Sequence, residues 1–475
     1  MLLLLLACDG DDTGKDPEYL DSADTGDTAD TGDTGTNDGG PLSGADLVID
    51  GEASSATGFG LAFAPGASGT DEAWVTAYFT SRACRFSAQA GNVSILDAPL
   101  CVTNTGSGEY MGASIAVSGQ QVALGAVGGR EAGAYAGKAY VFDVTGKSGE
   151  VTAEEAIAVI YAEVAGDYLG NAAAYVGDPG GDGHDDLLLG APANDDYGPG
   201  AGRAYLFGSG FSAAELWAND ADTRFYGQSN ESGVRHGAPE SGDGVGSVLN
   251  GAGDLDGDGL GDLVLGVNGA DEGGADAGLA AVFFGPAPAG DVSIRDADVI
   301  YVGEADGEYA GDFADGVGDL DGDGYGELLV SGDMALAGKA WLFHGPGTSG
   351  AVSTASTILA GETNDDQFGA SLAGAGDLDG DGTPDIVVGA YGSDRSGLDA
   401  GVAYVFHAPL ATGTVSSSAA SAVWTGLVEG DGAGRAVEGG GDYDGDGKAD
   451  LLVGAPYADV DDLAFSGQAF LVLGR

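Results

Sequence analysis

The chain has 475 residues, of which 76 are Asp or Glu and 15 are Lys or Arg, so its formal net charge is −61. Because the basic residues are scattered and not gathered into a stripe, this charge argues against nucleic acid as a partner, and it would repel an anionic bilayer surface. The length alone would allow two or three domains.

The first eight residues carry an export pattern. Met1 is followed by five Leu residues and then by Ala7 and Cys8. This run resembles the Leu-Leu-Ala-Cys end of a bacterial lipoprotein signal, which is cut before a cysteine that becomes lipid-modified. The resemblance implies a signal remnant at residues 1–8, lipidation at Cys8, and an exported protein that is lipid-anchored at the cell envelope or surface, or secreted. The apolar run is short and lacks a charged leader, so a start codon placed too late and an accidental match stay open.

Residues 9–40 are rich in Asp, Thr and Gly. The stretch from Asp24 to Gly35 repeats these three residue types almost without interruption. Such a composition has too little apolar surface to form a packed core. We expect residues 9–40 to be a disordered linker, followed by one folded domain at residues 41–475.

Two further cysteines, Cys84 and Cys101, follow in the first part of this domain. In an exported protein an isolated pair is expected to form a disulfide. Two cysteines without a nearby His do not make a structural zinc site. Two free buried thiols are the alternative.

Short apolar runs bounded by Gly and Asp recur from here to the end of the chain. One unit holds Phe368–Leu372, Ile386–Gly389 and Ala403–Phe406, and a run such as Val299–Val302 closes a unit. Counting the glycine-bearing starts gives seven units of four short strands. This pattern predicts an all-β fold, a seven-bladed β-propeller of four-stranded antiparallel blades.

Five units place an acidic loop directly before an apolar run. In the clearest copy, Asp254 to Asp262, side-chain oxygens stand at the first, third, fifth and ninth positions, and the seventh position can offer its carbonyl. Ca²⁺ takes roughly six to eight oxygen ligands, so the pattern predicts up to five bound Ca²⁺ ions. The predicted ligands are Asp178, Asp182, His184 and Asp186; Asp254, Asp256, Asp258, Leu260 and Asp262; Asp319, Asp321, Asp323, Tyr325 and Glu327; Asp377, Asp379, Asp381, Thr383 and Asp385; and Asp442, Asp444, Asp446, Lys448 and Asp450.

The spacing of these loops separates them from other calcium motifs. An EF-hand needs a Glu at the twelfth loop position and a helix on each side, whereas the twelfth positions here are apolar and a β-like run follows. The first aspartates are 76, 65, 58 and 65 residues apart, which indicates one supersecondary unit per repeat. The earliest loop has Gly180 in place of the second carboxylate, so we expect it to bind most weakly. For any single copy, an acidic turn without an ion is the alternative.

The borders of the units carry a family resemblance. Gln367–Ala370 with Gly389–Tyr391, and Tyr168–Gly170 with Gly190–Pro192, resemble the Phe-Gly and Gly-Ala-Pro marks of FG-GAP repeats, the units of the integrin α-subunit propeller. As in that family, the first units lack metal loops and the later ones have them. The resemblance implies a surface adhesion or recognition module with a protein or polysaccharide ligand. Val330–Gly332 departs from the pattern, which puts that strand boundary in doubt.

The two ends of the domain predict how the ring closes. The last unit stops at its third strand, Gln468–Gly474, while Asp46–Glu52 stands before the first unit just as Val299–Glu304 stands before a later one. We therefore expect residues 45–51 to supply the fourth strand of the last blade. A closed ring leaves few sheet edges open to other chains.

No catalytic motif accompanies the repeats. The four His residues lie in different units, without a nucleophile motif or a phosphate-binding loop. We interpret the chain as a non-catalytic, calcium-stabilised cell-surface recognition propeller that touches a membrane only through its lipid anchor. Its ligand would bind the long loops opposite the acidic ones, which include the insertion from Gln228 to Gly244. A propeller-type surface enzyme acting on polysaccharide and a purely structural envelope protein are the alternatives.

Overall fold

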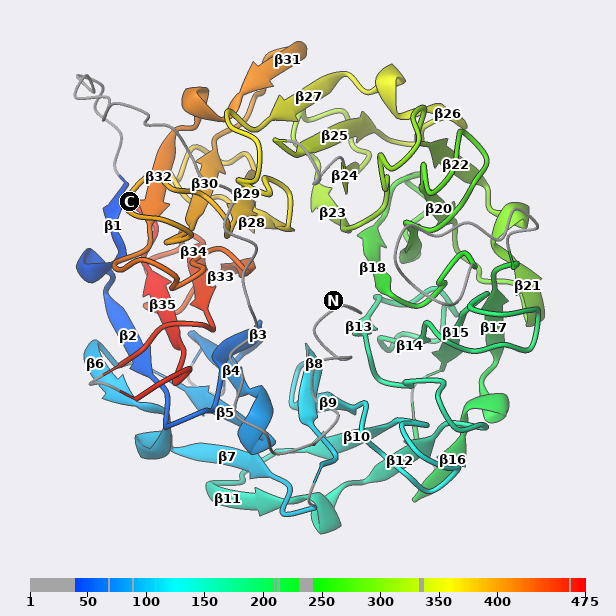
Figure 1. Ribbon diagram of the computed structural model, residues 1–475, viewed down its shortest axis with the longest axis horizontal. Helices are drawn as coiled ribbons and strands as arrows, with labels where there is room; N and C mark the ends of the chain where they lie inside the picture. Colours follow the sequence, from blue (N-terminus) through cyan, green and yellow to red (C-terminus); the bar gives the residue numbers. More distant parts are fainter. Residues whose placement is uncertain are drawn as a thin grey trace, which may run out of the picture. The chain divides into compact units, whose positions relative to one another are not determined.

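The strands form seven sheets arranged in a ring (Figure 1). The computed structural model describes residues 39–66, 69–87, 89–106, 108–208, 210–211, 214–229, 242–332, 337–460 and 463–475. Each sheet, called a blade below, contains four antiparallel strands, with the first nearest the centre of the ring and the fourth on the outside. The prediction of an all-β, seven-bladed propeller is confirmed.

The first four blades run in chain order around the ring. Blade 1 contains β3 (Thr57–Pro65), β4 (Asp71–Ala77), β5 (Arg82–Phe86) and β7 (Leu100–Thr103). Blade 2 contains β8 (Met111–Ser118), β9 (Gln121–Ala126), β10 (Lys138–Asp143) and β12 (Ala158–Tyr161). Blade 3 contains β13 (Ala173–Tyr175), β14 (Leu187–Ala191), β15 (Arg203–Phe207) and β17 (Thr223–Tyr226). Blade 4 contains β18 (Val248–Gly253), β19 (Asp262–Val267), β20 (Leu279–Phe283) and β22 (Val299–Val302).

The last three blades complete the ring. Blade 5 contains β23 (Ala314–Gly318), β24 (Glu327–Gly332), β25 (Lys339–His344) and β27 (Thr357–Ala360). Blade 6 contains β28 (Ser371–Gly376), β29 (Asp385–Ala390), β30 (Val402–Phe406) and β32 (Ala422–Thr425). Blade 7 contains β33 (Ala436–Gly441), β34 (Asp450–Ala455), β35 (Gln468–Val472) and β2 (Leu47–Asp50).

Every sheet also has a fifth strand, which the four-strand prediction did not include. It pairs in parallel with the fourth strand and comes from the connection between the third and fourth strands of the next blade, except in blade 6, where the amino-terminal segment supplies it. The connection then makes one 3-10 turn before the fourth strand. These strands are β11 (Gly149–Thr152), β16 (Glu215–Trp217), β21 (Gly290–Ser293), β26 (Gly350–Ala351), β31 (Gly413–Ser416), β1 (Gly40–Pro41) and β6 (Gly91–Ser94) on blades 1 to 7. The 3-10 turns are η2 (Leu42–Gly44), η4 (Ile95–Asp97), η5 (Ala153–Glu155), η6 (Ala218–Asp220), η7 (Ile294–Asp296), η8 (Val352–Thr354) and η9 (Ser417–Ala419), and one more, η3 (Tyr78–Thr80), follows β4.

The amino-terminal segment closes the ring. Strand β2 pairs antiparallel with β35, from Leu47 opposite Leu471 to Asp50 opposite Gln468, which confirms the predicted fourth strand of the last blade. The segment also supplies β1, which pairs in parallel with β32 of blade 6. Residues 40–50 therefore reproduce the whole strand, 3-10 turn and strand unit that the other blades build between their third and fourth strands.

The hydrophobic core consists of layers between neighbouring blades. Each of seven buried apolar clusters combines residues of two adjacent blades, such as Leu188 of blade 3 with Leu263 of blade 4. Because neighbours cover both faces of a blade, strands such as β14 and β20 are buried along their whole length. This explains why their sequences read as continuous apolar runs.

The predicted disulfide is present in blade 1. Cys84 of β5 and Cys101 of β7 stand directly opposite each other, and their sulfur atoms are bonded. Both residues are buried, in the cluster between blades 7 and 1. The bond therefore joins the third and fourth strands next to the place where the ring closes. Among the described residues, no helix is long and apolar enough to cross a membrane.

Leu47→Ala should destabilise the protein by about 2–5 kcal/mol, because Leu47 is fully buried in the closing strand and its loss leaves a cavity. Urea unfolding of the variant measures the change. Leu96→Ala removes the same atoms from a side chain that is 55% exposed and should change the free energy of unfolding by less than about 0.5 kcal/mol. Equal effects of the two substitutions would contradict the closing role of β2.

Candidate metal centres

The acidic loops connect the first and second strands of blades 3 to 7. In the loop of blade 4, the Asp254 carboxylate accepts hydrogen bonds from the amides of Gly257 (2.7 Å) and Gly259 (3.0 Å). Both glycines have positive φ, 77° and 88°, which a side chain would disfavour. The same bonds to the first aspartate recur in blades 5, 6 and 7. The first carboxylate therefore organises the turn, and the predicted pattern describes one repeated local structure.

The ninth residue of each loop is buried at the start of the second strand. Asp262 is fully buried, and its Oδ2 accepts from the amide of Leu255 (2.7 Å) while its Oδ1 accepts from Gly285 (2.9 Å). Asp385 and Asp450 make the corresponding pairs of bonds. This carboxylate thus fastens the loop to the end of the third strand.

The loops of blades 4 to 7 bring carboxylates together. In each, three side chains of the loop place one oxygen each within 4.8 Å of one another. In blades 4, 6 and 7 these come from the first, third and ninth positions, whereas in blade 5 they come from the first, third and fifth. The groups are Asp254, Asp256 and Asp262; Asp319, Asp321 and Asp323; Asp377, Asp379 and Asp385; and Asp442, Asp444 and Asp450.

Burial makes the ninth carboxylates hard to ionise without a cation. Desolvation raises the pKa of Asp262, Asp385 and Asp450 to about 6, despite the backbone donors that lower it. Neighbouring aspartates of the same loop contribute to this rise, and at Asp385 the nearby His407 opposes it. Converging oxygen donors with uncompensated negative charge fit a hard divalent cation such as Ca²⁺.

The loop of blade 3 folds similarly but lacks one carboxylate. Asp178 accepts hydrogen bonds from the amides of Asp182 (2.9 Å) and Gly183 (2.6 Å), as in the other turns. Gly180 offers no oxygen at the third position, and within the described part of the chain this loop forms no group of three converging ligands. The expectation that it binds most weakly stays a prediction.

Neighbouring loops touch through their seventh residues. The Tyr325 ring of blade 5 lies over Gly257 of blade 4, where an added Cβ would come within 2.9 Å of Cε1. Lys448 of blade 7 lies over Gly380 of blade 6 in the same way, and its Nζ donates to the carbonyl of Asp379 (2.9 Å). The side chain at the seventh position thus contacts the adjacent loop, whether or not the carbonyl of the same residue binds an ion.

Two histidines beside the loops were not among the predicted ligands. His344 Nδ1 lies 3.0 Å from Asp321 Oδ2, and His407 Nδ1 lies 3.1 Å from Asp379 Oδ2. His344 is the last residue of β25 and His407 directly follows β30, so both stand opposite the ninth loop residue. In the sequence, each histidine directly follows a phenylalanine of the third-strand run, Phe343 or Phe406, and this common position could have identified both.

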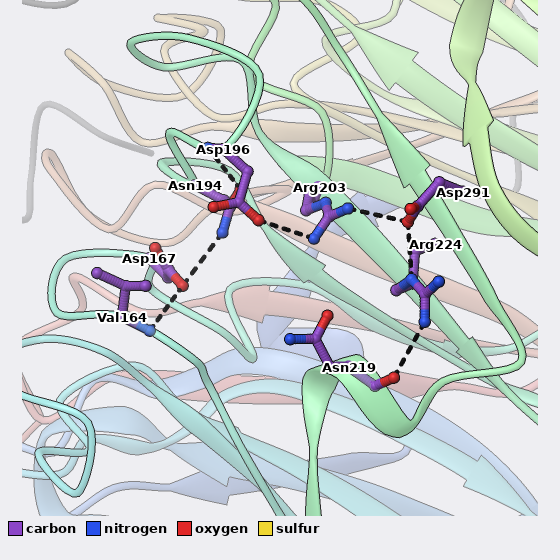
Figure 2. A network of polar contacts seen from close by, with 8 residues as sticks. All are labelled: Val164, Asp167, Asn194, Asp196, Arg203, Asn219, Arg224 and Asp291. Carbon is purple, nitrogen blue, oxygen red and sulfur yellow. Dashed lines mark hydrogen bonds and ion pairs between the residues drawn. The ribbon is translucent and has the colours of Figure 1, made fainter.

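The long loops between the second and third strands lie at the opposite ends of these strands from the acidic loops. In blade 3 a polar network holds this loop (Figure 2). Asn194 donates to Asp167 of the preceding connection (3.2 Å), and Arg203 pairs with Asp196 (2.9 Å) and with Asp291 of β21 (3.0 Å). Burial raises the pKa of Asp167 to about 6. The loop is therefore tied to two neighbouring blades.

Exposed apolar side chains collect on the same loop face at blades 6, 7 and 1. Val428, Phe465 and Leu398 are 62%, 58% and 56% exposed. Backbone hydrogen bonds join these loops in two groups: Gly430 donates to Leu398 in one, and Ala56 donates to Phe465 and Phe79 to Ser55 in the other. We call this set the apolar loop patch; its members are Phe79, Leu398, Leu427, Val428, Leu463 and Phe465. Most of the predicted insertion, residues 230–241, lies outside the described residues.

Two comparisons with known families agree with this geometry. The model of the FG-GAP-like repeat matches residues 319–388, and the model of the FG-GAP repeat matches residues 433–472. These segments contain the acidic loops of blades 5, 6 and 7 and all or part of the strand that follows each loop. The chain therefore contains FG-GAP repeats in a seven-bladed propeller.

Integrin α subunits share a short stretch of similar sequence. Integrin alpha-5 of Xenopus laevis is 40% identical over 88 residues, and integrin alpha-V of Gallus gallus is 38% identical over 89 residues. Each match covers 17% of this chain and only 8% of the relative. Among solved structures, the crystal structure of BBS1N in complex with ARL6DN, soaked with mercury, aligns with 90% of this chain and 93% of that chain, at 11% identity and a TM-score of 0.41.

Calcium should stabilise the protein more at about pH 7.5 than at about pH 5. The ninth aspartates have a folded pKa of about 6 against an ordinary value of 3.8. Their protonation therefore favours the folded, metal-free protein at low pH, and this contribution is lost as the pH rises through 6, where a cation can replace the proton. The measurement is the rise in melting temperature when about 2 mM CaCl₂ is added to metal-free protein. A rise that is equal at both pH values would contradict this linkage.

Proposed function

We propose that this FG-GAP propeller is a calcium-stabilised recognition module of the cell surface, without catalytic activity, that binds a protein or polysaccharide through the loop face opposite its acidic loops. The main support for this proposal is that the two ends of the blades carry different kinds of side chain. Converging carboxylates occupy one end of the strands, and exposed apolar side chains on interlinked loops occupy the other.

Calcium would be held by the loops of blades 4 to 7, and most weakly by that of blade 3. The first, third, fifth and ninth side chains and the seventh carbonyl would supply the oxygens. A bound ion would neutralise the buried ninth carboxylate, which joins the loop to the third strand. In this proposal calcium stabilises the blade and has no chemical role.

The apolar loop patch supports a ligand on the opposite face. Exposed apolar patches often mark contacts with another molecule, and these loops carry six exposed apolar side chains. The loops that carry them are fixed by hydrogen bonds to neighbouring blades, so little order would have to be gained on binding. Apolar contacts favour a protein surface, and a glycan is the other ligand class to test.

Among the described residues no histidine lies on the proposed ligand face, so we assign this face recognition and not acid–base catalysis. His184, His344 and His407 all belong to the acidic-loop end of the blades. We further propose export through the pattern at residues 1–8, lipid attachment at Cys8, and a linker at residues 9–40 that separates the propeller from the membrane surface. The first 38 residues lie outside the described part of the chain.

Removal of calcium should lower the melting temperature. With a dissociation constant of about 0.1 mM and free Ca²⁺ of about 2 mM, each site adds about 1.8 kcal/mol, so several sites together rival the net stability of a domain. Asp256→Ala removes one ligand and should lower the melting temperature in calcium by on the order of 2–4 °C. Differential scanning calorimetry with CaCl₂ and with EDTA measures both effects.

The matched control is Glu154→Ala, which removes an exposed carboxylate outside the acidic loops. It should leave both melting temperatures unchanged. If the wild type melts at the same temperature in calcium and in EDTA, the loops do not hold a stabilising ion.

Binding to a ligand should depend on the apolar loop patch. A screen of the full chain against glycans and surface proteins, with and without calcium, identifies the ligand. Leu398→Glu with Val428→Glu should then weaken binding at least about tenfold, or about 1.4 kcal/mol, by placing charges in the contact. Leu96→Glu, on an outer 3-10 turn, should bind as the wild type does. A ligand that tolerates the patch variants would place the binding surface elsewhere.

A further inference from the structure

One position of the blade faces the metal loop and differs between blades. It is the residue directly opposite the ninth loop residue on the third strand. In blade 5 the partners are Glu327 and His344. Continuing the registers of blades 4, 6 and 7 by one residue gives Phe284, His407 and Leu473 at the same place. The chain therefore contains versions of one site with and without a nitrogen donor.

Blade 5 also differs at the ninth position, where it has the longer Glu. In the three blades with Asp, one carboxylate oxygen of the ninth residue accepts a backbone amide from just beyond the third strand, at Gly285, Ala408 and Gly474. In blade 5 the corresponding oxygen, Glu327 Oε1, lies 3.2 Å from His344 Nδ1 instead. The longer side chain thus brings its oxygen to the imidazole.

Three donors meet in blade 5. His344 Nδ1 lies 3.0 Å from Asp321 Oδ2, and these atoms and an oxygen of Glu327 are all within 4.8 Å of one another. Glu327 is fully buried, whereas the His344 side chain is 37% exposed, so an ion could enter from solvent. In blade 6 His407 reaches Asp379, but among the described residues His407, Asp379 and Asp385 do not form a group of three converging donors.

The donor set suits a different ion from that of the other loops. Ca²⁺ is bound by oxygen, whereas imidazole nitrogen with carboxylate suits first-row transition ions and Zn²⁺. In a tetrahedral site, metal to donor distances of about 2.0–2.2 Å place two ligand atoms about 3.3–3.6 Å apart. The nitrogen to oxygen distances of 3.0 and 3.2 Å are slightly shorter, so the three side chains would have to open a little around an ion.

We propose that blade 5 binds a divalent transition-metal ion of the Zn²⁺ type through His344, Asp321 and Glu327, while the loops of blades 4, 6 and 7 take Ca²⁺. This inference rests on the proposed role of the loops as metal sites and specifies the ion for one of them. Asp321 belongs both to this group and to the carboxylate group of its own loop. The transition ion therefore competes with Ca²⁺ for Asp321.

The test is equilibrium dialysis of untagged full chain against Zn²⁺ in about 2 mM CaCl₂, with bound zinc counted by mass spectrometry. The wild type should retain one zinc ion that calcium does not displace. His344→Phe copies the residue of blade 4 and Glu327→Asp copies its ninth position, and each should weaken zinc binding at least about tenfold. His407→Phe, the matched control in blade 6, should keep the zinc ion.

Unchanged zinc binding in His344→Phe, or no zinc retained by the wild type in calcium, would overturn the proposal and indicate that His344 forms only ion pairs. Diffraction at the zinc edge gives a second measurement, in which the anomalous peak should lie between His344, Asp321 and Glu327. The calcium-dependent rise in melting temperature of His344→Phe is recorded in parallel. If calcium raises the melting temperature of neither the wild type nor any variant, the proposed function fails independently of the zinc result.

Discussion

A buried carboxylate at the start of the second strand is the constraint on which the acidic-loop end of the propeller depends. In blades 4, 6 and 7 this carboxylate accepts amides from the loop and from beyond the third strand, so three segments of the blade meet at one side chain. Its position in the apolar interior raises its pKa, and the other carboxylates of the loop add to the effect. A charge buried in this way needs a counterion or a proton. A bound cation would therefore relieve the cost of ionising these carboxylates at neutral pH.

Contacts between adjacent blades connect each acidic loop to the rest of the ring. Each apolar cluster belongs to two adjacent blades, and the fifth strand of each sheet comes from the next blade, or at blade 6 from the amino-terminal segment. Tyr325 and Lys448 extend the same contacts to the acidic loops by covering glycines of the preceding loop. Residues 40–50 close the ring, because they supply the strands that the other blades build between their third and fourth strands. Loosening one blade should thus affect two others.

Much of this arrangement follows from the sequence, because strand length, glycine position and carboxylate spacing are local properties. The seven units, the closing strand at Leu47–Asp50 and the Cys84–Cys101 disulfide were predicted correctly. The fifth strands were missed, since segments such as Gly290–Ser293 are short, largely polar and pair only with a different blade. His344 was missed for a related reason. It is 17 residues from Glu327 in sequence, and only the strand register places the two side chains together.

Long-wavelength anomalous diffraction from crystals grown in about 2 mM CaCl₂ locates bound calcium ions. Calcium peaks are expected in the loops of blades 4, 6 and 7, each coordinated by the buried ninth carboxylate and the first and third aspartates. A weaker peak, or none, is expected in the loop that contains Gly180. Well-ordered loops without calcium peaks, with their ninth carboxylates satisfied by backbone donors alone, would contradict calcium binding by these loops.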